Sequence, residues 1–430
     1  MAKTTFIAAG DAFITRRLPE GGYEGFDRLQ ACIQKHDVRF LNLESTFHNY
    51  ECAPAVTSGG TWARSDPRTL DDMKGYGFNL FNTANNHSGD FGTEGVLATI
   101  ENLKQRDMIF SGTGKHLGDA SKPCYLETKH TRVALISCST GIMESRAGAQ
   151  TGDMPGRPGL NPLRYIQIYH LDAERFAMAQ EVATASGVNA RQEKSIRNGY
   201  ATPPKEGTLS IGNTKFVRDE NCWVESLVNE QDMQRIEAEI REAKRQADVV
   251  LVSIHNHAMD GADTAQAPAF LKTFAHRCAD AGMDVMIGHG PHELQAIERY
   301  KDSLIFYSIG NFIFQAETVE FQPWDAYANR NMPLDTKVGA YMDERSANGT
   351  KGYCVQWPIW NAVLPAWTIE DGKITQVQLY PIELGMDKPR SQKGVPVLND
   401  SHETLEYLQK LCRDYGTQIQ IADGVGTIDF

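Results

Sequence analysis

The sequence predicts an α/β fold, because short apolar runs typical of buried strands alternate with amphipathic helical segments along most of the chain. Strands are expected at residues 3–14, 38–43, 78–83, 108–111, 133–138, 249–254, 283–287, 295–299 and 304–309, with a β-meander over 354–380. Helices are expected at residues 26–35, 67–75, 93–106, 172–186, 231–246, 267–281 and 401–415. Helices placed between successive strands are typical of sheets with both faces buried.

Two stretches interrupt this alternation. Residues 141–225 begin with a run that is dense in glycine and proline, and contain one expected helix and a short hairpin near 207–217. Residues 315–352 show no clear periodicity. Neither stretch has the composition of a flexible linker. We therefore expect a single domain over residues 1–430, with these two stretches as cap or insert segments over the edge of the sheet.

The composition narrows the classes of partner. The chain has 55 acidic residues against 43 lysines and arginines, a formal net charge of −12. Nucleic acid is not expected as a partner, because phosphate binding needs a basic face. The chain shows no membrane-spanning stretch and no pattern of a secretory signal, and its eight cysteines form no C-x-x-C pair. These features predict a cytoplasmic protein with reduced thiols.

Polar side chains follow five of the expected strands at the point where each strand ends. They are Gly10-Asp11, Asn42-Leu43-Glu44, Asn85-Asn86-His87, His255-Asn256-His257 and Gly288-His289-Gly290-Pro291-His292. Groups placed at the carboxyl ends of strands are how an α/β sheet builds a binding site. Carboxylate, amide and imidazole ligands without a thiolate favour one or two divalent ions, with manganese, zinc or iron preferred.

These motifs, in this order, resemble the CapA/PgsA family of capsule or poly-γ-glutamate synthesis proteins, which are relatives of the calcineurin-like metallophosphoesterases. The resemblance covers roughly residues 5–315. Besides the five clusters, it rests on Arg157-Pro-Gly-Leu-Asn161-Pro-Leu-Arg164 and on Tyr307-Ser308-Ile309-Gly310-Asn311-Phe312. It implies a four-layer α/β/β/α sandwich of the calcineurin-like type, with metal bound at the strand ends.

The resemblance also implies roles for single residues. By position, the implied metal ligands are Asp11, Glu44, Asn86, His255, His289 and His292. His87 matches a histidine that contacts the substrate. The chain departs from the family pattern at two places: His257 and Asp260 follow the fourth strand where relatives usually read His-Trp-Gly-x-Glu, and Gly290 stands where they usually carry a histidine.

The departures leave two interpretations of His257. It fills the space of the missing imidazole, or it is a new acid–base group. We predict His87, His257 and Asp260 as candidates for general acid or base. Arg16, Arg157, Asn161 and Arg164 are candidates for binding an anionic substrate, since arginine grips a carboxylate or phosphate with two hydrogen bonds. The alternatives are that Arg16 is solvated and that Asn161 only caps a helix.

Three functions stay open from the sequence. The first is a metal-dependent hydrolase that acts on a small anionic ester, amide, lactone or phosphoester, including γ-glutamyl or other peptide-like compounds. The second is a metal-assisted epimerase that acts at an α-carbon of a peptide or acid. The third is a non-catalytic protein of capsule or poly-γ-glutamate assembly. Self-association into a homo-oligomer is compatible with each of them.

Overall fold

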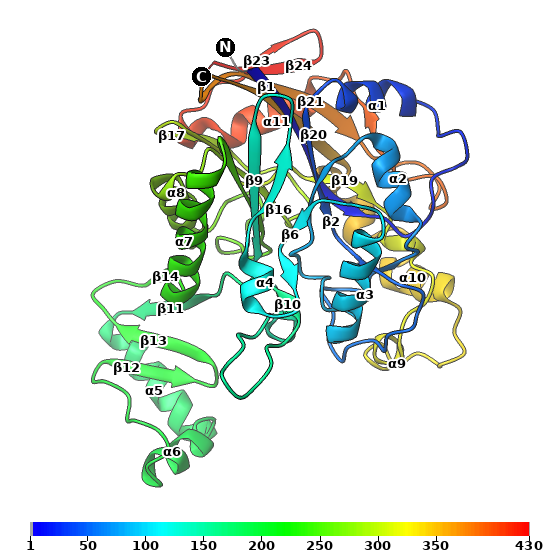
Figure 1. Cartoon of the computed structure of the whole chain (residues 1–430). Helices are drawn as coiled ribbons and strands as arrows, with labels where there is room; N and C mark the ends of the chain where they lie inside the picture. The colour runs from blue at the N-terminus through cyan, green and yellow to red at the C-terminus, as the bar shows by residue number, and fades with distance from the viewer. Residues whose placement is uncertain (1–2, 430) are drawn as a thin grey trace.

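The computed structural model describes residues 3–429 and has a mixed α/β fold, which confirms the predicted class (Figure 1). Two large sheets form the body of the molecule, and helices lie along their outer sides. Within the described residues, no helix is both long and apolar enough to cross a membrane.

The larger sheet has ten strands and is built around the amino-terminal strand. In spatial order they are β23 (Gln420–Ala422), β24 (Val425–Ile428), β21 (Lys373–Glu383), β20 (Asn361–Glu370), β1 (Lys3–Phe13), β2 (Val38–Leu43), β5 (Leu80–Asn82) and β6 (Phe110–Ser111), with β19 (Asn311–Phe314) on β1 and β22 (Val397–Leu398) on β21. β1 runs parallel to β2 and β19 and antiparallel to β20. The β-meander expected over 354–380 is confirmed from residue 361 onward, where β20 and β21 extend this sheet, but it is wrong for the residues before 361, most of which form two short 3-10 helices.

The second sheet has six strands. In spatial order they are β17 (Ile297–Tyr300), β18 (Ser303–Phe306), β16 (Val285–His289), β15 (Val249–His255), β9 (Arg132–Ser139) and β8 (Cys124–Glu127). β9, β15, β16 and β18 are parallel, so their carboxyl ends meet at one edge. The strands β15 and β16 each run on to the histidine that the sequence places just after an expected strand.

Successive side chains of β1 point to opposite faces of the large sheet, and this alternation explains how the layers pack. Phe6 and Ala8 join the apolar cluster that both sheets share, whereas Ile7 and Ala9 join the cluster on the opposite face. The first cluster also takes in α7 (Glu230–Gln246), α8 (Ala269–Ala281) and α11 (Glu403–Leu411), and the second takes in α1 (Phe26–Gln34), α2 (Thr69–Tyr76) and α3 (Gly92–Lys104). Both faces of the large sheet are therefore buried.

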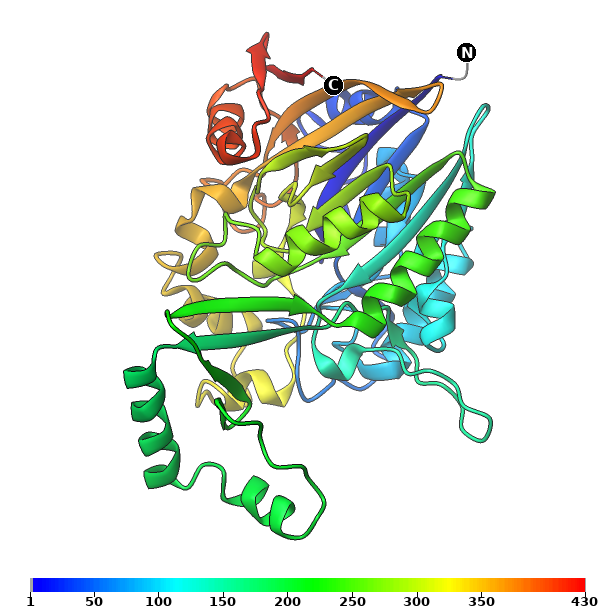
Figure 2. The same cartoon turned by 90° about the vertical axis from the view of Figure 1, so that its left-hand side faces the viewer.

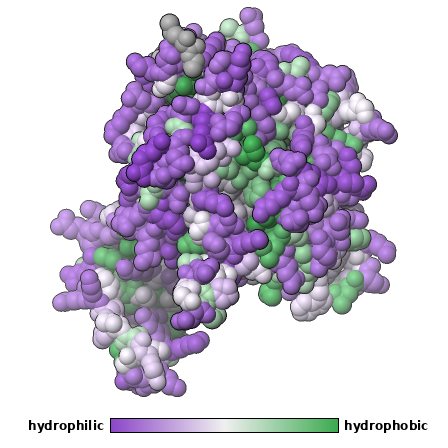
Figure 3. Space-filling view, in the orientation of Figure 1, coloured by the Kyte–Doolittle hydropathy of each residue, from purple (hydrophilic) through white to green (hydrophobic). Residues whose placement is uncertain are grey.

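The first irregular stretch contains more structure than the sequence predicts. It holds η1 (Met143–Ser145), β10 (Gly159–Leu160), α5 (Ala173–Ser186), α6 (Ala190–Arg197) and a four-stranded sheet of β12 (Thr208–Ile211), β13 (Thr214–Arg218), β11 (Tyr165–Leu171) and β14 (Trp223–Val228). The hairpin expected near 207–217 is confirmed. Residues 165–228, which hold α5, α6 and the four-stranded sheet, project from the body (Figure 2). We call these residues the insert. Apolar patches lie over it on a mostly hydrophilic surface (Figure 3).

The second irregular stretch is also partly helical. It contains η2 (Ala316–Thr318), α9 (Trp324–Ala328) and α10 (Val338–Ser346), and is followed by η3 (Gly352–Val355) and η4 (Trp357–Trp360). Both α-helices are too short to give a clear period of 3.6 residues. Their buried side chains Tyr327, Tyr341 and Met342 pack in a third cluster with Phe13 and Trp360. The remaining elements are β3 (Thr46–Phe47), β4 (Arg64–Ser65), β7 (Thr113–Gly114), α4 (Leu117–Ser121) and η5 (Arg413–Tyr415).

Candidate metal centre

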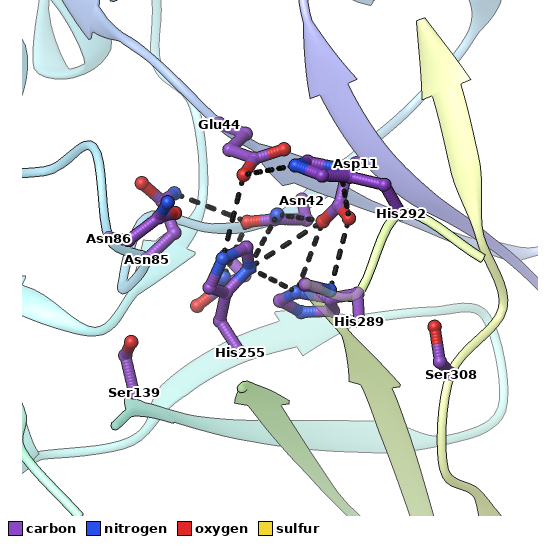
Figure 4. A network of polar contacts seen from close by, with 12 residues as sticks. Asp11, Asn42, Glu44, Asn85, Asn86, Ser139, His255, His289, His292 and Ser308 are labelled. Carbon is purple, nitrogen blue, oxygen red and sulfur yellow. Dashed lines mark hydrogen bonds and ion pairs between the residues drawn. The ribbon is translucent and has the colours of Figure 1, made fainter. Parts of the chain in front are cut away.

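The candidate metal centre lies where strands of the two large sheets end close together (Figure 4). β1 and β2 are parallel, with Asp11 opposite Asn42. β15 and β16 are also parallel, with His255 opposite His289. Because parallel strands end at the same edge, these registers bring side chains from distant parts of the sequence to one place.

Six side chains at this edge form two groups that could each hold a divalent ion. The groups are Asp11 with His255 and His289, and Glu44 with His257 and His292. Within each group, one ligand atom from every residue lies within 4.8 Å of the others. Five of the six residues are buried, and His257 is exposed. A carboxylate with two imidazoles is a ligand set that suits zinc, manganese or iron.

Asp11 is the centre of the first group. Its Oδ1 atom lies 3.5 Å from Nδ1 of His255 and 3.4 Å from Nδ1 of His289, and its Oδ2 atom lies 3.3 Å from Nδ1 of His292. The backbone N–H of Gly290 donates to Oδ2 over 3.0 Å. Burial raises the pKa of Asp11, but hydrogen bonds from the three imidazoles outweigh it and hold that pKa well below its usual range. Asp11 is therefore held as a carboxylate.

The pKa of Glu44 is shifted in the opposite direction to that of Asp11. Both of its side-chain oxygens are buried without a hydrogen-bond donor. Burial, and then the charges of Asp11 and Asp90, raise the pKa of Glu44 well above its usual value. Oδ1 of Asn86 is likewise buried without a donor. Such groups are costly in a folded protein unless a ligand compensates them, and a divalent cation beside Glu44 and Asn86 would do so.

Two of the histidines are oriented by polar neighbours, of which Asn311 lies in a motif named from the sequence and Ser253 does not. Nε2 of His289 lies 2.8 Å from the hydroxyl of Ser253. Nδ1 of His292 lies 2.9 Å from Oδ1 of Asn311. Partners of this kind fix the ring and the tautomer of a ligating imidazole. Burial lowers the pKa of His255 to about 4, so its imidazole is neutral and able to bind metal near pH 7.

His87 belongs to a separate pair beside the two groups. Its Nδ1 atom lies 2.7 Å from Oδ2 of Asp90, and both residues are buried. Asp90 also accepts the backbone N–H groups of Gly59 and Ala63 over 3.0 and 2.7 Å. The carboxylate therefore holds the imidazole in one orientation. The sequence signal for Asp90 is its position three residues after His87, one turn along the chain.

The backbone explains why residue 290 is glycine and where a replacement imidazole lies. Gly290 has a φ of 120°, and a Cβ there would come within 2.6 Å of the carbonyl oxygen of Asn256. A histidine at this position would be both strained and crowded. His257, one residue beyond Asn256, instead joins Glu44 and His292, and its Nε2 lies 3.0 Å from Nε2 of His255. The first interpretation of His257, as the substitute imidazole, has this geometric support.

A large cavity opens over the candidate metal centre. It has a volume of about 1010 Å³, and Asn86, His255 and His257 lie in its wall. Its other side is formed by the insert, through residues of β11 and β13. The cavity is large enough for a ligand bigger than a single phosphate or ester group.

Asp260 and Arg16 are not brought to this cavity. Asp260 is exposed and makes a backbone bridge with Asp263. Arg16 lines a smaller cavity of about 300 Å³, where its guanidinium donates to the hydroxyl of Thr318 over 3.1 Å and to the carbonyl of Ser391 over 2.6 Å. A role for Asp260 or Arg16 in the reaction stays a prediction, without support from proximity.

The shared segment 157–164 is placed beside the cavity, but its polar side chains are turned to other partners. Arg157 is exposed and donates to the carbonyl of Arg146. Asn161 is buried and donates to the carbonyl of Ser137 over 2.9 Å. Arg164 grips Asp232 with two hydrogen bonds of 2.7 and 3.0 Å. These contacts are structural, and substrate binding by the three residues remains an untested prediction.

Comparison with known proteins identifies the family of this chain. Residues 5–316 match the family described as bacterial capsule synthesis protein PGA_cap. The chain belongs to this family. The resemblance to CapA proteins that the motifs indicate is thereby confirmed, and the matched range contains every residue of the two ligand groups.

The alignments of this chain with its relatives cover different shares of the chain. An uncharacterized protein, y4sH, from Sinorhizobium fredii is 32% identical, and the alignment covers 99% of this chain and 92% of that protein. The capsule biosynthesis protein CapA of Bacillus anthracis is 25% identical over 57% of this chain and 42% of its own length. A probable polyglutamine synthesis accessory protein of Mycobacterium tuberculosis is 23% identical over 66% of this chain and 57% of its own length.

Proposed function

We propose that this protein is a metal-dependent hydrolase with two divalent ions, one held by Asp11, His255 and His289 and the other by Glu44, His257 and His292. The observation that carries the proposal is the pair of adjacent ligand groups, each with one carboxylate and two imidazoles. The unpartnered oxygens of Glu44 give independent support, since a buried carboxylate without donors calls for a cation. Asn86, with its unpartnered Oδ1, is a further ligand of the same centre.

The chain supplies the remaining functions of such a site. Ions bound there, with manganese, zinc or iron preferred by the ligand set, would lower the pKa of water and polarise a carbonyl or phosphoryl oxygen. We assign His257 to ligation, which leaves His87 as the side chain for proton transfer or substrate contact. Two observations support this role for His87: Asp90 holds its ring, and the neighbouring Asn86 lines the cavity.

The substrate that we propose is a small anionic ester, amide, lactone or phosphoester, including peptide-like γ-glutamyl compounds. The volume of the cavity supports a substrate larger than a single functional group. The names of the family's capsule and polyglutamine relatives support the peptide-like class. A cytoplasmic location and a homo-oligomeric state stay proposals alongside it.

The proposed architecture follows the same family relationship. We propose a four-layer α/β/β/α sandwich of the calcineurin-like type, formed by one domain over residues 1–430 with segments 141–225 and 315–352 as additions. The support is the apolar cluster shared by both sheets, together with helices on the outer face of each. Limited proteolysis tests the domain proposal. Cleavage is expected first in the insert, and the fragments on either side of it should stay associated and resist further digestion.

The function is tested on purified protein reconstituted with Mn²⁺ or Zn²⁺. We expect two ions per chain by inductively coupled plasma mass spectrometry, and hydrolysis of a panel of p-nitrophenyl esters and phosphoesters and of γ-glutamyl p-nitroanilide. Asp11→Asn keeps the shape but removes a ligand charge, and should lower hydrolysis by about a thousandfold, since several kcal/mol of charge stabilisation are lost. Its melting temperature serves as the folding control.

Two outcomes would redirect the proposal. Uptake of deuterium from D₂O into a γ-glutamyl peptide without cleavage would indicate the epimerase. Bound metal with neither cleavage nor exchange across the panel would favour a non-catalytic assembly role, in line with the accessory protein among the relatives. A protein that binds neither ion would refute the metal centre itself.

A further inference from the structure

We propose that Arg146 and Lys215, which both line the cavity, bind an anionic end group of the substrate, and that the insert contributes to selection by charge through Lys215. This inference rests on the proposed function, because it takes the candidate metal centre as the place where the substrate reacts. It concerns two residues that the sequence did not single out. Both line the same cavity as His255 and His257.

The cavity is composite, with one wall from the body and one from the insert. On the body side it is lined by Gly59, Asn86 and the two histidines of β15 and the following loop. On the insert side it is lined by Tyr165, Tyr169 and Lys215, among others. A ligand that reaches the candidate metal centre and fills this volume therefore contacts both walls.

Arg146 differs from Arg164 and Arg235 in having no carboxylate partner among the described residues. Its Nε atom is shielded from solvent and lacks a hydrogen-bond acceptor, and one terminal nitrogen makes a long contact of 3.4 Å to the carbonyl of Gly141. Arg164 and Arg235, by contrast, both pair with Asp232. A guanidinium with free donors in a cavity wall is suited to a carboxylate or phosphate, which it binds with two parallel hydrogen bonds.

The backbone holds Arg146 in place for this role. Its carbonyl accepts the side chain of Arg157 over 3.1 Å, and a parallel bridge links Arg146 to Leu160. Burial lowers the pKa of the Arg146 guanidinium from its usual value, but an arginine side chain stays protonated in proteins, so the group is charged. The backbone that carries this charge is therefore held in place before a ligand arrives.

The wall of the cavity is cationic, although the chain as a whole is acidic. The protein carries a formal net charge of −12. The described residues that line the cavity nevertheless include Arg146 and Lys215 and no aspartate or glutamate. The carboxylates Asp11 and Glu44 lie fully buried beneath it. A locally cationic wall in an acidic protein attracts anions and turns their charged end toward the insert.

The inferred substrate class is an extended molecule with a reacting ester or amide at one end and a carboxylate or phosphate at the other. A test uses Mn²⁺-loaded protein and three probes: γ-glutamylglutamate, the same dipeptide with its carboxylates converted to primary amides, and glycerol 3-phosphate. The variants are Arg146→Ala, Arg146→Lys and Lys215→Ala. Arg218→Ala is the matched control, because residues 215 and 218 point to opposite faces of β13 and Arg218 does not line the cavity.

Isothermal titration calorimetry should show that wild type and Arg218→Ala bind the anionic dipeptide at least about tenfold more tightly than its amide, as expected for a hydrogen-bonded charge pair. Arg146→Ala should lose that preference, Lys215→Ala should lose part of it, and Arg146→Lys should keep part of it. Tighter binding of glycerol 3-phosphate than of the dipeptide would identify a phosphate as the anionic group.

These measurements distinguish a failure of this inference from a failure of the proposed function. An Arg146→Ala variant that folds, judged by an unchanged melting temperature, and that retains the full preference overturns the inference, as does a wild type that binds the dipeptide and its amide equally or binds none of the probes. The proposed function is decided independently, by metal content and hydrolysis of the wild type. A protein with an Arg146-dependent anion preference but no hydrolysis would refute only the proposed function.

Discussion

The candidate metal centre and the insert are built in contrasting ways, although they face the same cavity. The ligand groups sit at the ends of parallel strands in fixed register, and Asp11, Glu44, His255 and His289 are at most 1% exposed. In the insert, α6 has no buried residue and α5 buries only Phe176 and Ala183. The difference indicates that the body of the molecule fixes the chemistry, whereas the insert is free to vary and to set specificity.

The attachment of the insert is also local. Its two ends meet where β11 and β14 pair, and the backbone N–H of Asn229 donates to the carbonyl of Arg164 over 2.7 Å. Tyr165 stacks on Phe270 of α8 with ring centroids 4.2 Å apart. Its ion pairs, such as Arg175 with Asp172, are at the surface and contribute little to stability. The insert can therefore be changed with little effect on the two sheets.

Of the changes that compare the two regions, the one with the largest expected effect lies inside the metal centre, at His257. In His257→Ala, the group of Glu44 and His292 loses an imidazole, so the bound metal should fall from two ions per chain toward one and hydrolysis should fall by at least about a hundredfold. Mass spectrometry after dialysis gives the metal content. His170→Ala is the control: this insert histidine pairs with Asp219, and its loss should leave two ions bound.

A second variant sharpens the same test. His257→Ala combined with Gly290→His returns an imidazole to the position usual in relatives, but the φ of 120° and the nearby carbonyl of Asn256 oppose it. We expect no recovery of the second ion and a lower melting temperature than for His257→Ala alone. Recovery of two ions would show that the two positions are interchangeable and that His257 is not required by the backbone.

A smaller and more selective effect is expected from removal of the insert. Because Gln167 pairs with Ser226 in the antiparallel β11 and β14, residues 168–225 can be replaced by Asn-Gly, a pair suited to a two-residue hairpin turn. This keeps the bond from the Phe270 N–H to the Ser226 hydroxyl. The shortened protein should retain two ions and lose part of its preference for anionic ligands, because Lys215 is gone while Arg146 remains. Loss of metal would contradict the independence of the two regions.

The sequence predicted the metal centre better than the insert for a physical reason. A strand buried on both faces leaves a continuous apolar run, as at 249–254, and the polar residue that ends it stands out. Parallel strands must end at one edge, so Asp11, Glu44 and His289 could be grouped without coordinates. How the ligands divide into two groups could not be predicted, because it depends on the path of the loop through Gly290 and on which ring lies beside Glu44.

The insert lacks both of these signals. Its strands are half exposed and short, and α6 has little apolar periodicity toward the body because nothing covers it. Arg146 and Arg157 precede the insert, in a stretch rich in glycine and proline, and nothing local in the sequence distinguishes them. Only the fold shows that one guanidinium lies in the wall of the cavity and the other is exposed, since a partner's position is a tertiary property.

The smallest effect on the reaction is expected at Arg164, which the sequence placed among the candidates for substrate binding. Asp232 is fully buried and accepts two hydrogen bonds from Arg164, which itself does not line the cavity. Arg164→Ala leaves that carboxylate with Arg235 as its remaining arginine partner, so the free energy of unfolding should fall by about 1–3 kcal/mol. KM should stay within about twofold of the wild type, whereas Arg146→Ala should raise KM by about tenfold with little change in stability.

Urea unfolding and steady-state kinetics on the two variants measure both quantities. Opposite patterns at Arg146 and Arg164 would show that a free guanidinium in the cavity wall, and not membership of the shared motif, marks the residue that meets the substrate. A raised KM for Arg164→Ala at unchanged stability would instead return that arginine to substrate binding. In that case the substrate would be bound through Nη1 of Arg164, because the bonds to Asp232 and Asn229 use the other two nitrogens of that side chain.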